Sequence, residues 1–218
     1  MNLIPAQDNI TAELFDQIAD QLEDKGYIIL PSLLPAELTD SLFNEVAQLN
    51  KAEFQDAGIG RDQQNQQNNF VRTDEIRWLN GETEAQAGFL EFMSTLRLEL
   101  NRRLFLGLFD YECHFAHYAP GDFYKRHLDA FHGKSNRVLS TVVYLNPGWT
   151  PNDGGELLMY EQKQREHFLK VTPMYGSCVI FLSERFPHEV LKANRDRYSI
   201  AGWFRINNSI GGVVDPAR

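Results

Sequence analysis

Two histidines and one aspartate are spaced so that they could bind a single divalent metal ion. His127 and Asp129 are separated by one residue, and His188 lies much later in the chain. Because successive side chains on a strand point to opposite faces, an extended segment 124–129 would aim His127 and Asp129 at one point. The third ligand must then come from another strand. Two neutral nitrogen donors and one anionic oxygen suit borderline metals such as iron and disfavour an all-thiolate site.

Arg197 adds a possible anion-binding group, because it follows His188 on the next expected strand. Burying an arginine among apolar residues is costly unless it has an anionic partner, and its planar guanidinium grips a carboxylate with two parallel hydrogen bonds. Two imidazoles and one carboxylate with open metal positions form the facial triad of non-haem Fe(II) oxygenases. An arginine beside such a metal would suit a dicarboxylate cosubstrate. The alternative is an ordinary ion pair with Asp196 or Glu189.

Length and composition predict one ordinary globular domain. The chain has 218 residues, of which 43% are hydrophobic and 23% are charged. A formal net charge of −9 argues against nonspecific binding to nucleic acid, and no apolar segment approaches the length of a membrane span. Cys113 and Cys178 do not form a CxxC motif, so we expect two buried thiols in a reducing compartment. Because no signal peptide is evident, we expect a cytoplasmic enzyme.

Apolar periodicity predicts helices first and strands afterwards. We expect a helix capped by Thr11 and ended by Gly26, a strand at 27–30, a helix beginning at Pro35, and a long helix at 83–105. A strand-like segment at 72–79 precedes that long helix. Later strands are expected at 111–118, 122–128, 138–145, 156–160, 166–171, 177–183, 186–191 and 198–206. This order predicts a mainly β, α+β fold, a sandwich or jelly roll backed by helices.

Several other segments and side chains have two possible roles. The Gln/Asn-rich segment 56–70 could be a plain solvated loop or a loop that covers a substrate. Tyr118, Tyr124 and Tyr144 could be core aromatic residues or could reach a cosubstrate or substrate. Tyr124 precedes His127 by three residues, so a regular strand would place it on the opposite face. The remaining histidines are interpreted as structural, surface or loop residues: His114, His117, His132 and His167.

Together these motifs resemble the 2-oxoglutarate- and Fe(II)-dependent prolyl hydroxylases. The branch in question is that of the hypoxia-sensing prolyl hydroxylases and their bacterial relatives, and the resemblance spans roughly residues 70–206. It is carried by the segments Arg72–Trp78, Tyr118–Asp129, Val143–Asn146, Gly154–Leu157, His188–Val190 and Arg197–Trp203. Three features depart from the family pattern: the turn between Tyr118 and His127 is one residue shorter than in the animal enzymes, the stretch from Asp129 to Tyr144 is one longer, and segment 56–70 shares little. All three affect the substrate entrance.

The resemblance implies a fold, a domain layout and a set of site residues. It implies a double-stranded β-helix core, also described as a jelly roll or cupin-like core, in a single domain 1–218. Residues 1–106 would supply supporting helices, the first strands and a substrate loop, and residues 107–207 the core. Carried over by motif position, iron would be held by His127, Asp129 and His188. The 2-oxoglutarate would be held by Arg197, Tyr144 and Tyr118. The substrate would lie near Arg72, Asp74, Trp78, Tyr124 and Trp203.

The implied activity is hydroxylation of a prolyl residue in a protein, with release of succinate and CO₂. The cofactors would be Fe(II), 2-oxoglutarate and O₂, with ascorbate as a further candidate. The partner would be a protein with an exposed proline, such as a translation factor. Three alternatives stay open: an oxygenase of a free amino acid or small molecule, a zinc hydrolase with the same ligands, and a noncatalytic cupin-like sensor that binds metal and 2-oxoglutarate.

Overall fold

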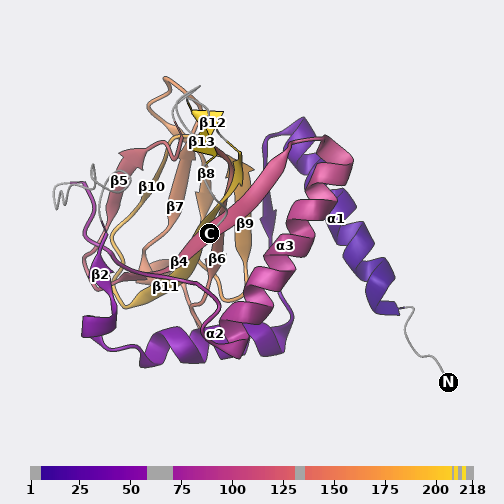
Figure 1. The fold of residues 1–218 in the computed structure, drawn as a ribbon. Helices are drawn as coiled ribbons and strands as arrows, with labels where there is room; N and C mark the ends of the chain where they lie inside the picture. The colour runs from indigo at the N-terminus through magenta and orange to yellow at the C-terminus, as the bar shows by residue number, and fades with distance from the viewer. Residues whose placement is uncertain (1–5, 58–70, 131–135, 208, 211–212, 215–218) are drawn as a thin grey trace.

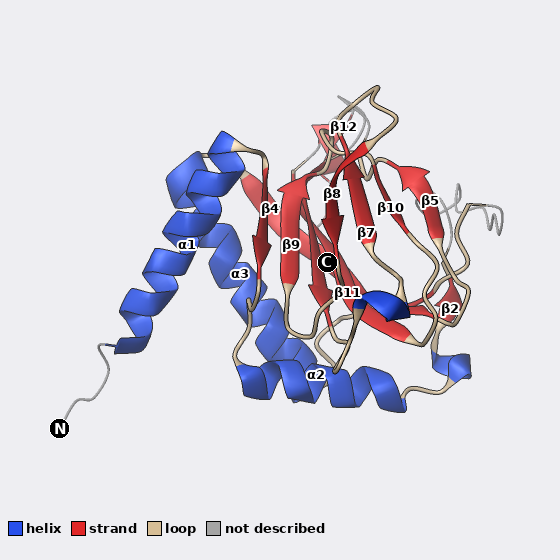
Figure 2. Ribbon diagram, turned by 180° about the vertical axis from the view of Figure 1, so that it is seen from behind, coloured by secondary structure: helices blue, strands red, loops and turns tan. Residues whose placement is uncertain are grey.

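Two antiparallel β-sheets and a layer of helices make up most of the described part of the chain (Figures 1 and 2). The structure is a computed structural model that describes residues 6–57, 71–130, 136–207, 209–210 and 213–214. The helical elements are α1 (Ala6–Asp24), α2 (Ala36–Gln48), α3 (Glu84–Leu104) and the 3-10 turns η1 (Lys51–Glu53) and η3 (Pro151–Asp153).

The larger sheet has seven strands in the order β1-β9-β6-β11-β4-β3-β2, and the smaller has four in the order β5-β10-β7-β8. The strands of the larger sheet are β1 (Tyr27–Leu30), β2 (Gln55–Asp56), β3 (Glu75–Trp78), β4 (Leu108–Tyr118), β6 (Arg137–Tyr144), β9 (Cys178–Leu182) and β11 (Arg197–Ile206). Those of the smaller sheet are β5 (Tyr124–His127), β7 (Leu157–Tyr160), β8 (His167–Val171) and β10 (His188–Val190). A separate pair is formed by β12 (Ser209–Ile210) and β13 (Val213–Val214).

The two faces of the larger sheet belong to two different cores. On β11, Ile200 and Phe204 pack with residues of the three helices, in a core on the outer face of the sheet. Alternation therefore turns Arg197, Ser199 and Trp203 toward the inner face. The second core lies on that inner face and includes residues of both sheets. Polar side chains on the inner face of β11 are thus held between the sheets, where water is largely excluded.

The helix boundaries follow local sequence signals, with one exception. The helix α3 lies within the expected range 83–105 and has Thr83 as its N-cap, whose hydroxyl accepts a hydrogen bond from the Gln86 amide. Gly26 follows α1 with φ of +82°, a left-handed conformation that suits a glycine after a helix end. The expected cap at Thr11 is wrong, because α1 begins at Ala6. The heptad-like apolar spacing starts near Thr11, but helical backbone extends further towards the N-terminus.

The expected α+β architecture, a double-stranded β-helix with supporting helices, is confirmed. Each late strand occurs within a few residues of its expected bounds, because glycine, proline and asparagine turns separate them. Both cysteines are free and buried. The expected loop at 56–70 lies, from residue 58 on, outside the described residues. Within the described residues, no helix has the length and hydrophobicity needed to cross a membrane.

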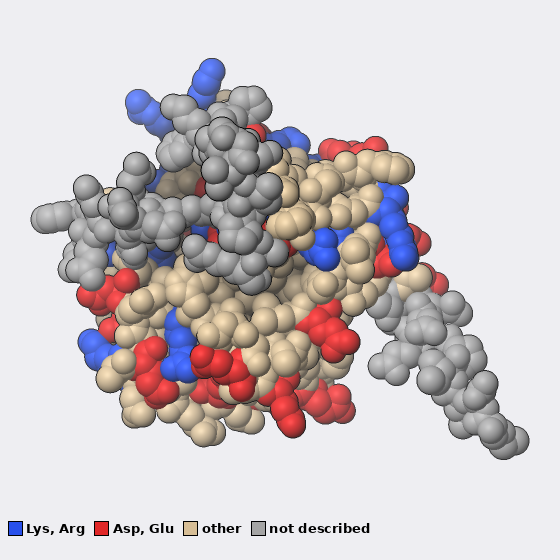
Figure 3. All heavy atoms as spheres, viewed as in Figure 1, with Lys and Arg blue, Asp and Glu red and all other residues tan. Residues whose placement is uncertain are grey.

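Charged side chains are dispersed on the face drawn in Figure 3. Both blue and red side chains occur there, and red ones predominate along the lower edge of this view.

Candidate active site

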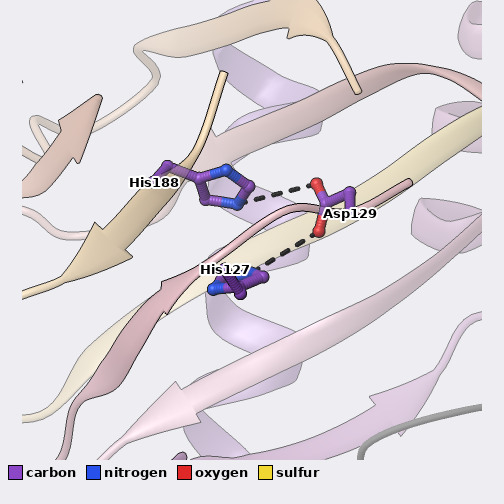
Figure 4. A group of neighbouring side chains, drawn as sticks. All are labelled: His127, Asp129 and His188. Carbon is purple, nitrogen blue, oxygen red and sulfur yellow. Dashed lines mark ion pairs between the residues drawn. The ribbon is translucent and has the colours of Figure 1, made fainter. Parts of the chain in front are cut away.

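His127, Asp129 and His188 converge between the two sheets (Figure 4). Nε2 of His127 lies 3.5 Å from Oδ1 of Asp129, and Nε2 of His188 lies 3.6 Å from Oδ2. One ligand atom from each of the three residues lies within 4.8 Å of the others. The two histidines face each other across an antiparallel pair, because His188 on β10 is opposite His127 on β5. Asp129 follows β5 in a bend, so the strand ends sooner than expected but still delivers the carboxylate to the same point.

Backbone carbonyls fix both imidazoles in one orientation. Nδ1 of His127 lies 2.8 Å from the Lys125 carbonyl, and Nδ1 of His188 lies 3.0 Å from the Phe186 carbonyl. Since a carbonyl can only accept, each Nδ1 carries the proton, and each Nε2 keeps its lone pair for a metal ion. This is the arrangement expected of metal-binding histidines.

The pKa shifts of Asp129 and His188 favour the forms that bind metal. Burial opposes ionisation of Asp129, but the two histidines and Arg137 hold the pKa of its carboxyl well below its usual range. Burial lowers the pKa of His188 to about 4, so its ring is neutral at physiological pH. A carboxylate anion and a neutral imidazole are the required donors for a divalent cation.

Tyr124 contradicts the strand-parity prediction. Its ring stacks on that of His127, with centroids 3.6 Å apart and planes 12° from parallel. The reason is a register shift: two positions of β10, from His188 to Val190, span three positions of β5, from His127 to Tyr124. The extra residue of such a β-bulge re-aims side chains, so Tyr124 lies beside the triad instead of on the opposite face.

Arg197 lies buried on the inner face, with a relative exposure of 1%. Its Nε donates to the Gly155 carbonyl at 2.9 Å, and Nη1 donates to the Ser199 hydroxyl at 3.3 Å. Among the described residues, no carboxylate lies within ion-pair distance of this guanidinium. The acids considered as ordinary partners are engaged elsewhere: Asp196 contacts His117 and Glu189 contacts Tyr160.

Tyr144 and Tyr118 flank the Arg197 guanidinium. The guanidinium carbon lies 4.8 Å from the centre of the Tyr118 ring and 5.2 Å from that of Tyr144. The Tyr144 hydroxyl is buried and has no hydrogen-bond partner within the described part of the chain. Burial raises the pKa of Tyr144, so its hydroxyl stays protonated and can donate. A buried cation without a counter-charge beside an unsatisfied donor is costly, and an anionic ligand would relieve both costs.

These residues fit an Fe(II) ion and a dicarboxylate. The donor set of two nitrogens and one oxygen suits iron and leaves positions open for other ligands. The buried guanidinium and the unpartnered Tyr144 hydroxyl suit a carboxylate group.

The segment before α3 reaches the site through two contacts. Arg72 forms a two-point ion pair with Asp74, with N–O distances of 2.8 and 2.6 Å, and its guanidinium lies 4.3 Å from the centre of the Tyr124 ring. Trp78 on β3 is 40% exposed and meets His114 edge-on at 5.2 Å. His114 in turn lies 5.5 Å from Trp203. Arg72 and Asp74 thus reach the triad through Tyr124, which stacks on His127, whereas Trp78 and Trp203 both contact His114.

Comparisons with known proteins agree with this geometry. Residues 113–205 match the model of the 2OG-Fe(II) oxygenase superfamily. The crystal structure of a Pseudomonas putida prolyl-4-hydroxylase is 42% identical in sequence and covers 89% of this chain and 100% of its own, with a TM-score of 0.79.

The chain belongs to the 2OG-Fe(II) oxygenase superfamily.

Two more relatives extend the similarity to animal proteins. A Trichoplax adhaerens prolyl hydroxylase, solved with a peptide fragment of the hypoxia inducible factor oxygen degradation domain, is 26% identical and covers 91% of this chain and 92% of its own, with a TM-score of 0.80. The Egl nine homolog 1 of Mus musculus is 24% identical over 198 residues, which is 87% of this chain and 49% of that protein. This oxygenase thus spans about half the length of that curated relative. Membership of the superfamily implies Fe(II) and 2-oxoglutarate as cofactor and cosubstrate.

The inner face of this oxygenase holds further polar residues that were not expected to take part. Ser199 contacts Arg197, and it shares a strand face with it by simple alternation, so parity could have found it. Arg137 lies 3.6 Å over the Trp203 ring and donates twice to Glu112. Ser140 donates to Asp129. A serine or arginine in an ordinary strand has no spacing signature, so the partners of Ser140 and Arg137 become visible only in three dimensions.

His114 of this oxygenase should lower stability in mild acid. Burial lowers its pKa from 6.5 to about 4. As pH falls through 6.5, the unfolded chain gains a proton that the folded chain does not take up until pH nears 4. The free energy of unfolding therefore falls by about 3 kcal/mol between pH 6.5 and pH 4. The lowered pKa of His188 reduces stability over the same pH window. In the folded chain the Asp129 carboxyl takes up its proton only below this window.

The substitution His114→Phe keeps a ring between Trp78 and Trp203 but cannot titrate. We expect a shallower fall of the unfolding free energy between pH 6.5 and 4 than in the wild type, measured by urea denaturation of the metal-free protein. The exposed His167→Gln is the matched control and should keep the wild-type slope. Equal slopes for His114→Phe and wild type would contradict the assignment.

Proposed function

We propose that this chain is a 2-oxoglutarate- and Fe(II)-dependent dioxygenase that hydroxylates a prolyl residue in a protein. The observation that carries the proposal is the combination of a His-Asp-His triad with a buried arginine that has no carboxylate partner among the described residues, both between the sheets. Prolyl hydroxylation is supported by the similarity of the chain to the Pseudomonas putida prolyl-4-hydroxylase and the Trichoplax adhaerens prolyl hydroxylase.

His127, Asp129 and His188 would hold the iron. Their side chains are 7–16% exposed, so the ion would be reachable from one side and shielded on the others. Backbone carbonyls hold the two rings with Nε2 free, and the Asp129 carboxyl is ionised, so the ligands need little rearrangement. When bound, iron and 2-oxoglutarate supply the oxidative chemistry, in which O₂ and the keto acid are converted to succinate and CO₂ and one oxygen atom enters a C–H bond of the substrate.

Arg197 would bind the far carboxylate of 2-oxoglutarate. Its guanidinium offers two parallel N–H groups, and the Tyr144 hydroxyl can donate a third hydrogen bond. Tyr118 would form one wall beside the guanidinium. The burial of Arg197 excludes water, which strengthens the pairing of the two charges.

The substrate would enter beside Tyr124 and Trp203. Tyr124 is held between Arg72 and His127, so its ring position depends on the Arg72–Asp74 ion pair. Trp203 is held between Arg137 and His114. Two rigid aromatic surfaces near a metal site are suited to a compact ring such as proline. The exposed Trp78 would contact residues flanking the target proline.

The partner would be a protein with an exposed proline. The Trichoplax adhaerens relative was solved with a peptide fragment, which supports a peptide-binding site in this family. A translation factor is the partner suggested by the resemblance to bacterial prolyl hydroxylases. A free amino acid or small metabolite is the competing substrate class.

Two measurements test the proposal. In cells, proteomics should find a prolyl residue that gains the mass of one oxygen atom when the gene is intact, and that loses it on gene deletion or in Asp129→Ala. In vitro, a peptide with that proline should stimulate succinate formation by the Fe(II) protein, and His127→Ala should abolish the stimulation.

Each alternative has a distinct outcome. Turnover of 2-oxoglutarate stimulated only by a small molecule would replace the protein substrate. Hydrolytic activity with Zn(II), without 2-oxoglutarate turnover, would indicate a hydrolase. Binding of metal and 2-oxoglutarate without any substrate-stimulated turnover would indicate a sensor. Full succinate formation in His127→Ala would contradict the metal assignment itself.

A further inference from the structure

Two buried serines form a hydrogen-bond chain that ends on the Asp129 carboxylate. The Ser140 hydroxyl lies 2.6 Å from Oδ2 of Asp129, and it lies 2.8 Å from the hydroxyl of Ser183. Ser140 is on the inner face of β6 with 1% exposure, and Ser183 follows β9 with 0% exposure. The two come from strands that pair directly.

The direction of this chain follows from counting protons. An ionised carboxylate can only accept, so Ser140 must use its single hydroxyl proton on Asp129. Ser183 must then donate to the Ser140 oxygen, because Ser140 has no second proton to give. A hydroxyl that accepts one hydrogen bond becomes a better donor of the next, so Ser183 strengthens the bond from Ser140 to Asp129. The 2.6 Å distance is typical of a charge-assisted O–H···O⁻ bond.

The three members of the triad are each oriented by a different partner. His127 and His188 are oriented by backbone carbonyls, which no side-chain substitution removes. Asp129 is oriented by a side chain instead: the hydroxyl of Ser140, on the separate strand β6, donates a hydrogen bond to its carboxylate. The orientation of Asp129 therefore depends on a residue that can be changed without altering any ligand.

We propose that Ser140, supported by Ser183, is a positioning residue that holds Asp129 as a one-oxygen metal ligand. This inference rests on the proposed iron site. The hydrogen bond from Ser140 to Oδ2 disfavours an orientation in which both carboxylate oxygens would face the metal. One-oxygen binding keeps a further metal position open for the cosubstrate and O₂, which a two-oxygen mode would reduce. Ser140 acts through Asp129 and is not itself a ligand.

Metal affinity of the purified full-length chain tests this role without relying on turnover. We expect Ser140→Ala to bind Mn(II) about 10–100-fold more weakly than wild type in calorimetric titration, the loss usual for a group that orients a metal ligand. Ser140→Thr keeps the hydroxyl and should restore most of the affinity. Ser183→Ala should cause a smaller loss, because it removes only the polarising donor.

A matched control separates a positioning role from general loss of structure. Ser177 is also buried, and its hydroxyl donates to a backbone carbonyl, that of Met174. Ser177→Ala should leave the Mn(II) affinity at the wild-type value. In the Co(II) protein, Ser140→Ala should also change the intensity of the visible absorption band, which depends on the number of metal ligands. Ser177→Ala should leave that band unchanged.

The outcomes distinguish failure of this inference from failure of the proposed function. If wild type binds Mn(II) and His127→Ala does not, but Ser140→Ala matches wild type in both affinity and Co(II) spectrum, the positioning role is wrong and the metal site stands. If His127→Ala binds Mn(II) as well as wild type, the proposed iron site is wrong. Ser140→Ala could lose metal binding because it is unfolded, which circular dichroism would show. In that case Ser140→Thr decides. If Ser140→Thr is folded but binds metal weakly, the inference is overturned, and if it binds metal like the wild type, the inference is supported.

Discussion

Replacing Arg197 with Met should weaken 2-oxoglutarate binding by about 30-fold to several thousand-fold, which corresponds to about 2–5 kcal/mol for loss of one partner of a buried charge pair. The expected loss is large because Arg197 is 1% exposed and, among the described residues, has only neutral hydrogen-bond partners. A bound dicarboxylate would supply its counter-charge. In the variant, a buried carboxylate would have no cation to pair with.

Calorimetric titration of 2-oxoglutarate into the Mn(II) protein under anaerobic conditions measures this loss directly. Arg197→Lys should recover part of the affinity, because a lysine keeps the charge but cannot form two parallel hydrogen bonds. The control is Arg195→Lys, since Arg195 lies in the exposed turn before β11 and stacks on Trp149 instead. Wild-type affinity in Arg197→Met would show that the carboxylate binds elsewhere and would remove the main support for the proposed cosubstrate site.

The same titration distinguishes the contributions of the groups around Arg197. The Tyr144 hydroxyl is a neutral donor, whereas Arg197 brings a charge that burial makes expensive when unpaired. Arg197 should therefore dominate affinity, and Tyr144 should mainly fix the orientation of the carboxylate. Both side chains are almost fully buried, so the difference between them is one of charge and not of exposure.

The residues that form the proposed metal site were predictable because their chemistry has a spacing. A His-x-Asp pair in a strand region and a later His already predict a shared site, and the structure brings all three together. The anion-binding role of Arg197 stays a prediction, and it rests on the cost of burying an arginine in an apolar strand. The helix α3 was predictable from its apolar face.

Other features depended on three-dimensional register. The stacking of Tyr124 on His127 arises from a β-bulge, which adds one residue to one strand and leaves no clear mark in the sequence. Ser140 reaches Asp129 across strands, so only their register makes it relevant. The start of α1 at Ala6 was missed because a helix can continue beyond its amphipathic segment. A single sequence reveals the regular repeat of side chains along helices and strands. The features that were missed are departures from that repeat or contacts between separate strands.

Gly202 is the clearest case of a constraint that the sequence alone does not show. It lies in the middle of β11, paired with Cys113 on one side and Thr141 on the other, on the face that packs against the helices. A Cβ placed there would overlap the hydroxyl oxygen of Tyr111 and would lie 2.8 Å from Cβ of Cys113. Tyr111 cannot move aside freely, because its hydroxyl is hydrogen-bonded to Thr141 at 2.7 Å and its ring packs 4.6 Å from that of Phe204.

We therefore expect Gly202→Ala to lower the free energy of unfolding by about 3 kcal/mol or more, at the upper end of the cost of overpacking a core. Urea denaturation monitored by tryptophan fluorescence measures the change. Gly88→Ala is the matched control, because Gly88 lies in α3 and its added Cβ would meet only Leu38 at an ordinary 3.5 Å. That substitution should stabilise the protein, by about 0.5–1 kcal/mol, through helix propensity.

A double-mutant cycle identifies the clash as the cause. Tyr111→Leu removes the atoms nearest the added Cβ, so Gly202→Ala should cost less in that background than in the wild type. Some cost should remain, because Cys113 is still close. Equal costs in both backgrounds would contradict the clash with Tyr111. Because Gly202 has no side chain, β11 can lie close to the Tyr111 ring of β4. The strand that presents Arg197, Ser199 and Trp203 to the active site is therefore positioned in part by packing on its opposite face.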